Sequence, residues 1–238
     1  MPSFDSPSTL DRRGLMAAAV TLGAVASSSG FVQAQTPRAA VGETYSPQAK
    51  PLPFDPKSIH GLSERLLVSH HDNNYVGAVK RLGAITSQTA ALDPAKAPGF
   101  MLNGLKREEL IAWNSMILHE LYFAGLGLPS ARAPLLEQQI AKDFGGYDRW
   151  ASEFAAMGKA LGGGSGWVLL TWSNRDRRLL NQWAADHTMT LAGSTPLLAL
   201  DMYEHAYAID YGANAGAYVD AFMKAINWSN ASAVFVMV

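Results

Sequence analysis

Hydrophobic residues recur at helical spacing in the first long uninterrupted segment of the chain, residues 58–82. They lie three and four positions apart, as on the buried face of a helix: Leu62, Leu66, Leu67, Val76, Val79 and Leu82. The same spacing returns over residues 106–123, and a Gly-Leu-Gly stop follows at 125–127. A loop with two prolines, residues 86–104, separates them. We therefore expect two helices that pair as an antiparallel hairpin.

The pattern changes after Pro129. Residues 135–144 and 147–161 have helical spacing, and a Gly-rich break at 162–166 precedes the apolar run 167–172, which is typical of a buried strand. Residues 179–184 predict the returning strand, residues 197–200 a third short strand and residues 215–227 a closing helix. The fold class is therefore α+β. We expect a helical hairpin domain over 58–130 and a C-terminal α/β domain with a three-stranded antiparallel sheet over 131–238.

The N-terminal residues predict an export signal followed by an extended arm. Arg12 and Arg13 precede a largely apolar stretch, and small residues end the segment at Ala34, so we expect removal of residues 1–34. The paired arginines resemble the twin-arginine signal that exports folded proteins, while an ordinary secretory signal is the alternative. The apolar stretch is shorter than a membrane-spanning helix requires, so we expect no stable membrane anchor and a periplasmic or secreted protein. Five prolines predict an extended arm over residues 35–57.

The composition limits which partners and which metal ligands the chain can have. The chain has 238 residues, 48% hydrophobic and 16% charged, which is typical of a globular protein. Its net charge of -1 provides no basic surface of the kind that nucleic-acid binding requires, so we expect no such partner. The chain has no cysteine, so a metal would have to be held by histidine and carboxylate.

Asp201 and His205 are the most informative polar pair. They lie four apart, directly after the apolar residues 197–200, so a helical turn would aim both side chains at one metal ion. The alternative is a helix-terminal Asp beside an ordinary core His. His70 and His119 lie on the two predicted hairpin helices and could face the same crevice. Three imidazoles and one carboxylate suit iron or manganese, and would also accept zinc.

Several motifs together resemble the iron/manganese superoxide dismutase family over residues 51–228. The strongest are Gly164-Ser-Gly-Trp167, His119-Glu-Leu-Tyr-Phe123 and Asp201-Met-Tyr-Glu-His-Ala-Tyr207. The resemblance implies a mononuclear iron or manganese cofactor that converts superoxide to oxygen and hydrogen peroxide. It places the metal ligands at four positions: His70, His119, Asp201 and His205.

The resemblance also assigns the surroundings of the metal. His187 falls where the family has a Gln or His that hydrogen-bonds the solvent on the metal, which makes it the candidate catalytic residue. Trp167 and Phe123 match aromatic walls of the pocket, and Tyr203 stands where Trp is usual. Glu204 matches a Glu that crosses to the partner subunit's metal site, which implies a homodimer or a higher homo-oligomer. His60 precedes the first helix, and we expect it to be structural.

The chain departs from the family at three linked positions. In a gapless alignment Asn74 replaces a second His, Ala78 replaces the Tyr that lines substrate access, and Ala208 replaces a Tyr that reaches across the dimer. Tyr75 is a candidate source of the missing phenol. An alternative alignment, anchored on Tyr75 as the access Tyr, puts Leu67 on the first ligand position and His71 on the second His.

These departures leave other functions open. We expect a superoxide dismutase whose activity is reduced by the altered access funnel. The alternatives are a non-dismutating metal-binding or structural protein of the same fold, or another metal-dependent oxidoreductase.

Overall fold

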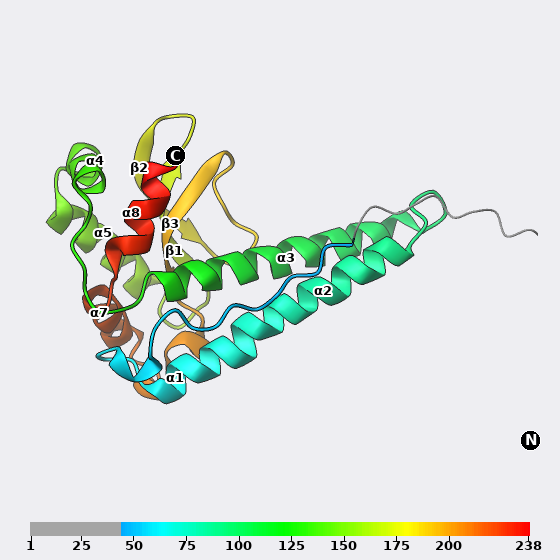
Figure 1. The fold of residues 1–238 in the computed structure, drawn as a ribbon, viewed down its shortest axis with the longest axis horizontal. Coiled ribbons are helices and arrows are strands. Elements are labelled where there is room, and N and C mark those ends of the chain that lie inside the picture. Colours follow the sequence, from blue (N-terminus) through cyan, green and yellow to red (C-terminus); the bar gives the residue numbers. More distant parts are fainter. Residues whose placement is uncertain (1–43) are drawn as a thin grey trace, which may run out of the picture. The chain divides into compact units, whose positions relative to one another are not determined.

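The computed structural model describes residues 44–238. The predicted export signal and residues 35–43 of the predicted arm lie outside the described residues. Residues 44–55 contain no helix or strand and run beside the long helices (Figure 1). The Tyr45 ring stacks on Trp113, and the carbonyl of Tyr45 accepts a 2.9 Å hydrogen bond from Thr86. The described part of the arm is therefore attached to both hairpin helices.

The hairpin is built from more elements than its hydrophobic pattern predicts. After the 3-10 helix η1 (Pro56–Ser58) come α1 (Glu64–Ser69), a π-helix η2 (His70–Tyr75), α2 (Val76–Ala91) and α3 (Gly99–Ala124). The prediction of one helix beginning at residue 58 was wrong, because Gly61 adopts a φ of +85° and Ser63 then caps α1 by accepting a hydrogen bond from Leu66.

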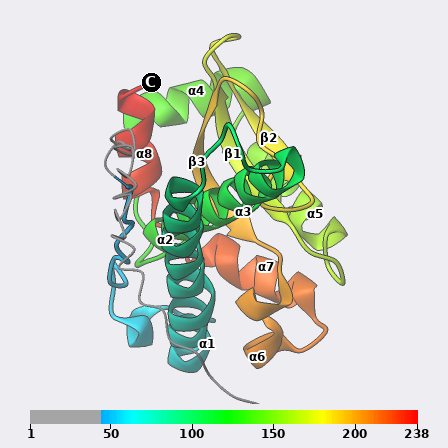
Figure 2. The same cartoon turned by 90° about the vertical axis from the view of Figure 1, so that its right-hand side faces the viewer.

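The predicted loop 86–104 was also too long, since only residues 92–98 join α2 to α3. Pro98 directly precedes α3 and fixes its start. Gly104 is exposed and has open space around it, so α3 continues through this residue at a small cost in propensity. α2 and α3 run side by side in Figures 1 and 2.

The C-terminal part contains the sheet and its covering helices. α4 (Pro134–Phe144) and α5 (Tyr147–Ala160) precede β1 (Trp167–Ser173), β2 (Arg178–Ala184) and β3 (Ser194–Asp201), and the antiparallel sheet has the order β2-β1-β3. β1 is central and every one of its residues is buried, as the continuous apolar run predicts. α5 packs on β1 and α8 (Trp228–Val236) on β3 (Figure 2).

The chain ends differently from the prediction of a single helix over 215–227. After η3 (Glu204–Ala206) and α6 (Ala208–Tyr211), α7 (Ala215–Lys224) ends before Asn227. The side chain of Asn227 accepts a hydrogen bond from Ser229 and so begins a separate helix, α8. Within residues 44–238, no helix combines the length and the apolar character that crossing a membrane requires.

Candidate metal centre

Four side chains from distant parts of the chain meet at one point. The possible ligand atoms of His70, His119, Asp201 and His205 all lie within 4.8 Å of one another. His70 begins the π-helix η2, His119 lies on α3, Asp201 ends β3 and His205 lies on η3. The structure thus brings together the four residues that the sequence analysis proposed as ligands.

Asp201 is the centre of this cluster. Its Oδ2 atom lies 3.1 Å from Nε2 of His70, 3.2 Å from Nε2 of His205 and 3.6 Å from Nε2 of His119. Its Oδ1 atom accepts a 2.8 Å hydrogen bond from the backbone N–H of Tyr203. Burial opposes ionisation of Asp201, but the hydrogen bonds and charges of His205 and His70 outweigh it, so the pKa of this carboxyl lies well below its usual range.

The route by which Asp201 and His205 meet differs from the prediction. We expected a helical turn, but Asp201 is the last residue of strand β3 and His205 lies in a separate 3-10 helix. The chain turns at residues 202–203, and the Asp201 carboxylate holds this turn through the N–H of Tyr203. Two residues four apart can therefore be brought together by a helical turn or by an Asx-type turn, and this chain has the Asx-type turn.

His119 is oriented by its own helix. Its Nδ1 atom donates a 2.6 Å hydrogen bond to the carbonyl of Ser115, one turn earlier on α3. This bond fixes the tautomer and leaves the Nε2 lone pair facing the cluster, where that atom has no hydrogen-bond partner among the described residues. Burial, followed by the charge of His70, lowers the pKa of His119 to about 3, so the imidazole is neutral at pH 7.

These atoms fit a metal ion by their chemistry. His70 is also fully buried, and burial lowers its pKa, so it too presents a neutral ring. Neutral imidazoles and an ionised carboxylate are the forms that bind a cation. One anionic oxygen and three imidazole nitrogens form a donor set that suits iron or manganese. The unpartnered Nε2 atom of His119 is buried beside the Asp201 carboxylate, and a cation at the centre of the cluster would satisfy it.

His187 lies beside this cluster and is held by two residues. Its Nδ1 atom accepts a 3.0 Å hydrogen bond from the indole N–H of Trp167, and its carbonyl accepts a 2.6 Å bond from Asn114. An indole can only donate, so Nδ1 of His187 carries no proton and the neutral ring carries its proton on Nε2. Burial lowers the pKa of His187, which favours this neutral form. The Tyr203 ring stacks on His187 and on His205.

A cavity of about 210 Å3 leads to the centre. His119, His187 and His205 line its inner end. The substituted positions Asn74 and Ala78 line it as well, as the gapless alignment predicts. We call this cavity the access funnel. Ala208, the third substituted position, is exposed on α6.

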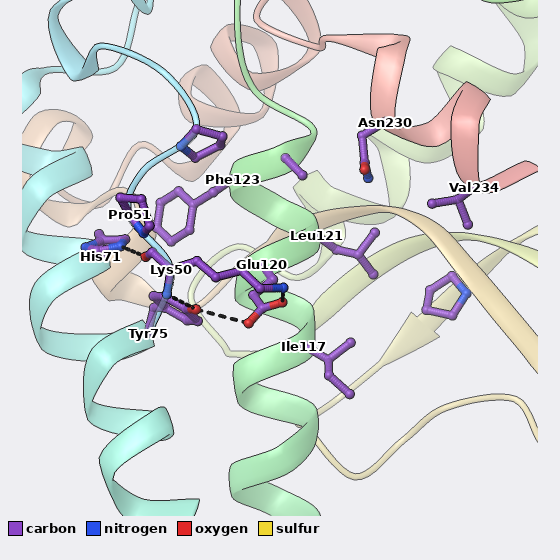
Figure 3. Close-up of a pocket in the computed structure, with 13 residues that line it drawn as sticks. Lys50, Pro51, His71, Tyr75, Ile117, Glu120, Leu121, Phe123, Asn230 and Val234 are labelled. Carbon is purple, nitrogen blue, oxygen red and sulfur yellow. Dashed lines mark hydrogen bonds and ion pairs between the residues drawn. The ribbon is translucent and has the colours of Figure 1, made fainter. Parts of the chain in front are cut away.

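Tyr75 does not replace the missing phenol of the funnel. It lines a second cavity of about 340 Å3, between the arm, α3 and α8 (Figure 3). Its hydroxyl accepts a 2.8 Å bond from the N–H of Lys50 and donates a 3.0 Å bond to Glu120, which also pairs with the Lys50 ammonium group. The suggestion that Tyr75 supplies the phenol was therefore wrong.

The structure also contradicts the alternative alignment, which put Leu67 on the first ligand position and His71 on the second His. His71 lines this second cavity too, and its Nε2 atom donates a 2.8 Å bond to the carbonyl of Lys50 (Figure 3). Leu67 is fully buried in the hydrophobic core. His70, and not His71, therefore joins the cluster.

The two predicted aromatic walls lie beside the imidazoles, whereas Glu204 and His60 lie at the surface. The Phe123 ring lies 5.1 Å from the His70 ring, and the Trp167 ring lies 5.3 Å from the His119 ring, measured between ring centroids. Glu204 is exposed, and its carboxylate makes no hydrogen bond or ion pair with the described residues. His60 is exposed before α1. Phe123 and Trp167 thus form walls around the imidazoles.

Sequence reasoning missed several supporting residues. Tyr218 of α7 is fully buried and donates a 2.7 Å hydrogen bond to the backbone carbonyl of Asp201, while Tyr122 packs its ring 4.9 Å from His70. Ser115 and Asn114 orient His119 and His187. Only Ser115 gave a usable signal, because it lies four residues before a candidate ligand on a predicted helix.

Comparison with known proteins gives consistent matches. Residues 132–234 match the family described as iron/manganese superoxide dismutases, C-terminal domain. A protein of Cupriavidus metallidurans named "Superoxide dismutase [Fe]" is 63% identical over 188 residues, which cover 79% of this chain and 95% of the relative. "Superoxide dismutase [Mn] 1" of Halobacterium salinarum is 33% identical over 182 residues, 75% of this chain and 89% of the relative. "Superoxide dismutase [Fe]" of Aquifex pyrophilus is 33% identical over 184 residues, 73% of this chain and 84% of the relative.

Proposed function

The chain belongs to the iron/manganese superoxide dismutase family, and from that premise we propose that one metal ion is held by His70, His119, Asp201 and His205. The enzyme converts superoxide to oxygen and hydrogen peroxide, and its cofactor is iron or manganese. The observation that carries the ligand assignment is the meeting of four buried or half-buried ligand atoms within 4.8 Å. When bound, the metal supplies a one-electron couple between its 3+ and 2+ states.

The residues of this chain then have distinct tasks. Asp201 supplies the negative charge that favours a cation, and the bond from Tyr203 keeps its other oxygen occupied. The carbonyl of Ser115 holds His119 in the tautomer whose Nε2 is free. Trp167 and Phe123 enclose the imidazoles in aromatic rings, which limits access of water.

We propose His187 as the catalytic side chain that faces the reacting molecules. Because Trp167 occupies Nδ1, His187 presents an N–H donor at Nε2 from the inner end of the funnel. The peroxide-forming half of the reaction consumes protons, and a donor held at that position can orient the solvent molecule that carries one.

Two variants of His187 separate a chemical role from a structural one. His187→Gln keeps an N–H donor, whereas His187→Ala removes it. We expect the Ala variant to lose most of its dismutation rate and to change its pH profile, while the Gln variant keeps a substantial rate. Equal rates and profiles for wild type and His187→Ala would exclude the catalytic role.

Asp201→Asn tests the ligand set directly. It retains an oxygen for Tyr203 but removes the anionic ligand. Replacement of residues that only support a ligand already costs about 10 to 100-fold in metal affinity, so we expect a loss of at least about 100-fold. Metal analysis of the purified protein, together with a superoxide-removal assay, measures the effect. A stoichiometric metal content in Asp201→Asn would refute the assignment.

We also propose that the enzyme is a homodimer with Glu204 at the interface. Its exposed carboxylate is free of bonds to the described residues, and it lies next to the ligand His205. Sedimentation of Glu204→Gln should show a larger monomer fraction than wild type. Asp148→Asn, which removes a similar charge at an exposed residue of α5, serves as control.

We further propose that the protein functions in the periplasm or outside the cell, delivered by the twin-arginine route. The support is the sequence of residues 1–34. Arg12→Lys combined with Arg13→Lys should retain the protein in the cytoplasm, and cell fractionation measures this. Unchanged export would reject the twin-arginine route, and absence of the wild-type protein from the exported fraction would reject export altogether.

A further inference from the structure

The access funnel has more room than superoxide needs. Its volume is about 210 Å3, whereas a water molecule takes about 30 Å3 in the liquid. The room arises because small residues line the funnel at Gly77, Ala78 and Ala112. A molecule several times the size of water therefore fits beside the imidazoles.

The polar groups of the funnel favour an anion. Among residues 44–238 no carboxylate lines it, whereas six neutral polar side chains and one guanidinium group do: Asn73, Asn74, Ser115, His119, His187, His205 and Arg81. Arg81 of α2 pairs with Glu108 of α3 through its Nη2 atom, and this leaves other N–H groups of its five donors available. The charge of Arg81 also reaches the inner end of the funnel, since it adds to the effect of burial in lowering the pKa of His187.

Two further donors face the same space without a strong partner. The side-chain amide of Asn74 lines the funnel and makes no hydrogen bond with another of residues 44–238. Ser115 is 8% exposed, and its hydroxyl lies 3.4 Å from Nδ1 of His119, whose proton already goes to the Ser115 carbonyl. The Ser115 hydroxyl proton is therefore free to point into the funnel.

From this arrangement we propose that the access funnel is a binding site for a small carboxylate-like oxyanion, such as formate or hydrogencarbonate. Arg81 binds one oxygen of the anion, and Asn74 and Ser115 bind a second oxygen. An anionic oxygen suits a guanidinium group, whose N–H groups form charge-assisted hydrogen bonds with it. The bound oxyanion blocks the path to His187 and so acts as a competitive inhibitor. This inference rests on the proposed function only for its inhibitory consequence.

Calorimetric titration of the metal-loaded protein with formate, and separately with hydrogencarbonate, at constant ionic strength tests the site. We expect a dissociation constant on the order of millimolar. Arg81→Gln should weaken binding about tenfold, because it removes a charge-assisted hydrogen bond, and Asn74→Ala about threefold. Ala78→Leu should abolish binding by filling the funnel. Arg175→Gln, a change of the same charge at an exposed turn, should leave binding unchanged.

The outcomes separate this inference from the proposed function. If formate and hydrogencarbonate bind wild type and Arg81→Gln equally, the oxyanion is held elsewhere, and the site is rejected. If neither binds below about 100 mM while the enzyme dismutates superoxide, the site is rejected and the function stands. If one anion binds in an Arg81-dependent manner but no dismutation occurs, the site stands and the proposed function fails. Binding of only one of the two anions identifies the natural class.

Discussion

Gly166 is the backbone position whose replacement should disturb the metal centre most. It precedes Trp167 at the start of β1, and its carbonyl accepts a 2.9 Å hydrogen bond from Met202, the residue after Asp201. Its φ is +133°, and an added Cβ would lie 2.2 Å from the carbonyl oxygen of Ala184. Because Cβ atoms essentially never approach within 3.0 Å, Gly166→Ala must move the backbone by nearly 1 Å.

The cost can be separated into two parts. A non-glycine residue at such a φ costs about 1–3 kcal/mol. Relieving an overlap with a fixed backbone atom adds about 1–3 kcal/mol. Gly146 provides the matched control, because its φ is +132° and no atom lies within 4 Å of an added Cβ. Gly146→Ala should therefore show only the conformational cost, and Gly166→Ala should exceed it by about 1–3 kcal/mol.

Urea unfolding of the two variants and wild type measures the difference in the free energy of unfolding. Gly166→Ala should also lower the dismutation rate by up to about 100-fold, since a displacement near 1 Å in a catalytic arrangement can cost that much. Gly146→Ala lies far from the centre in the sequence and should keep the wild-type rate. Equal destabilisation by the two substitutions, or full activity of Gly166→Ala, would show that β1 shifts without moving Trp167 and that the reasoning is wrong.

Further predictions concern pH, the second cavity and the funnel. Burial lowers the pKa of His119 to about 3 from an ordinary 6.5, so between these pH values the unfolded metal-free protein binds a proton at His119 that the folded protein does not. The stability of the metal-free protein should therefore fall as pH decreases from about 6.5 toward 3. A urea midpoint that stays constant in this window would contradict the neutral, buried state of His119. Tyr75→Phe should lower the free energy of unfolding by about 1–2 kcal/mol, because the hydrogen bonds to Lys50 and Glu120 are lost. The dismutation rate should stay unchanged. A large loss of rate would show that the Tyr75 hydroxyl acts in the access funnel after all. Turnover of the wild-type enzyme should be lower than that of family members with the access Tyr, and Ala78→Tyr should raise it. A wild-type protein as fast as those members would show that the Tyr is dispensable.

The sequence was sufficient to identify the candidate ligand residues, but it did not predict the geometry that brings them together. His70, His119, Asp201 and His205 were found because their motifs are specific, and the hydrophobic periods located both halves of the fold. A strand over residues 197–200 was predicted, but with Asp201 on a helical turn after it, and the π-helix that begins at His70 was not predicted, since the ends of short elements at a site depend on tertiary bonds. The role of Tyr75 was misjudged for the same reason. Spacing along a helix cannot show which of two cavities a side chain faces when a π-turn changes the rotation per residue.

The four ligands are spread along the chain, and this has a consequence for when the enzyme can acquire its metal. His70 is made before α2 and α3, whereas Asp201 and His205 are made only after β1 and β2. A growing chain therefore lacks half of the donor set until β3 and η3 have been made, and a metal bound earlier would have only two imidazoles to hold it. The complete donor set therefore exists only after both halves of the fold have been made, so the cluster can hold its ion with all four side chains only when folding of the C-terminal part is nearly complete.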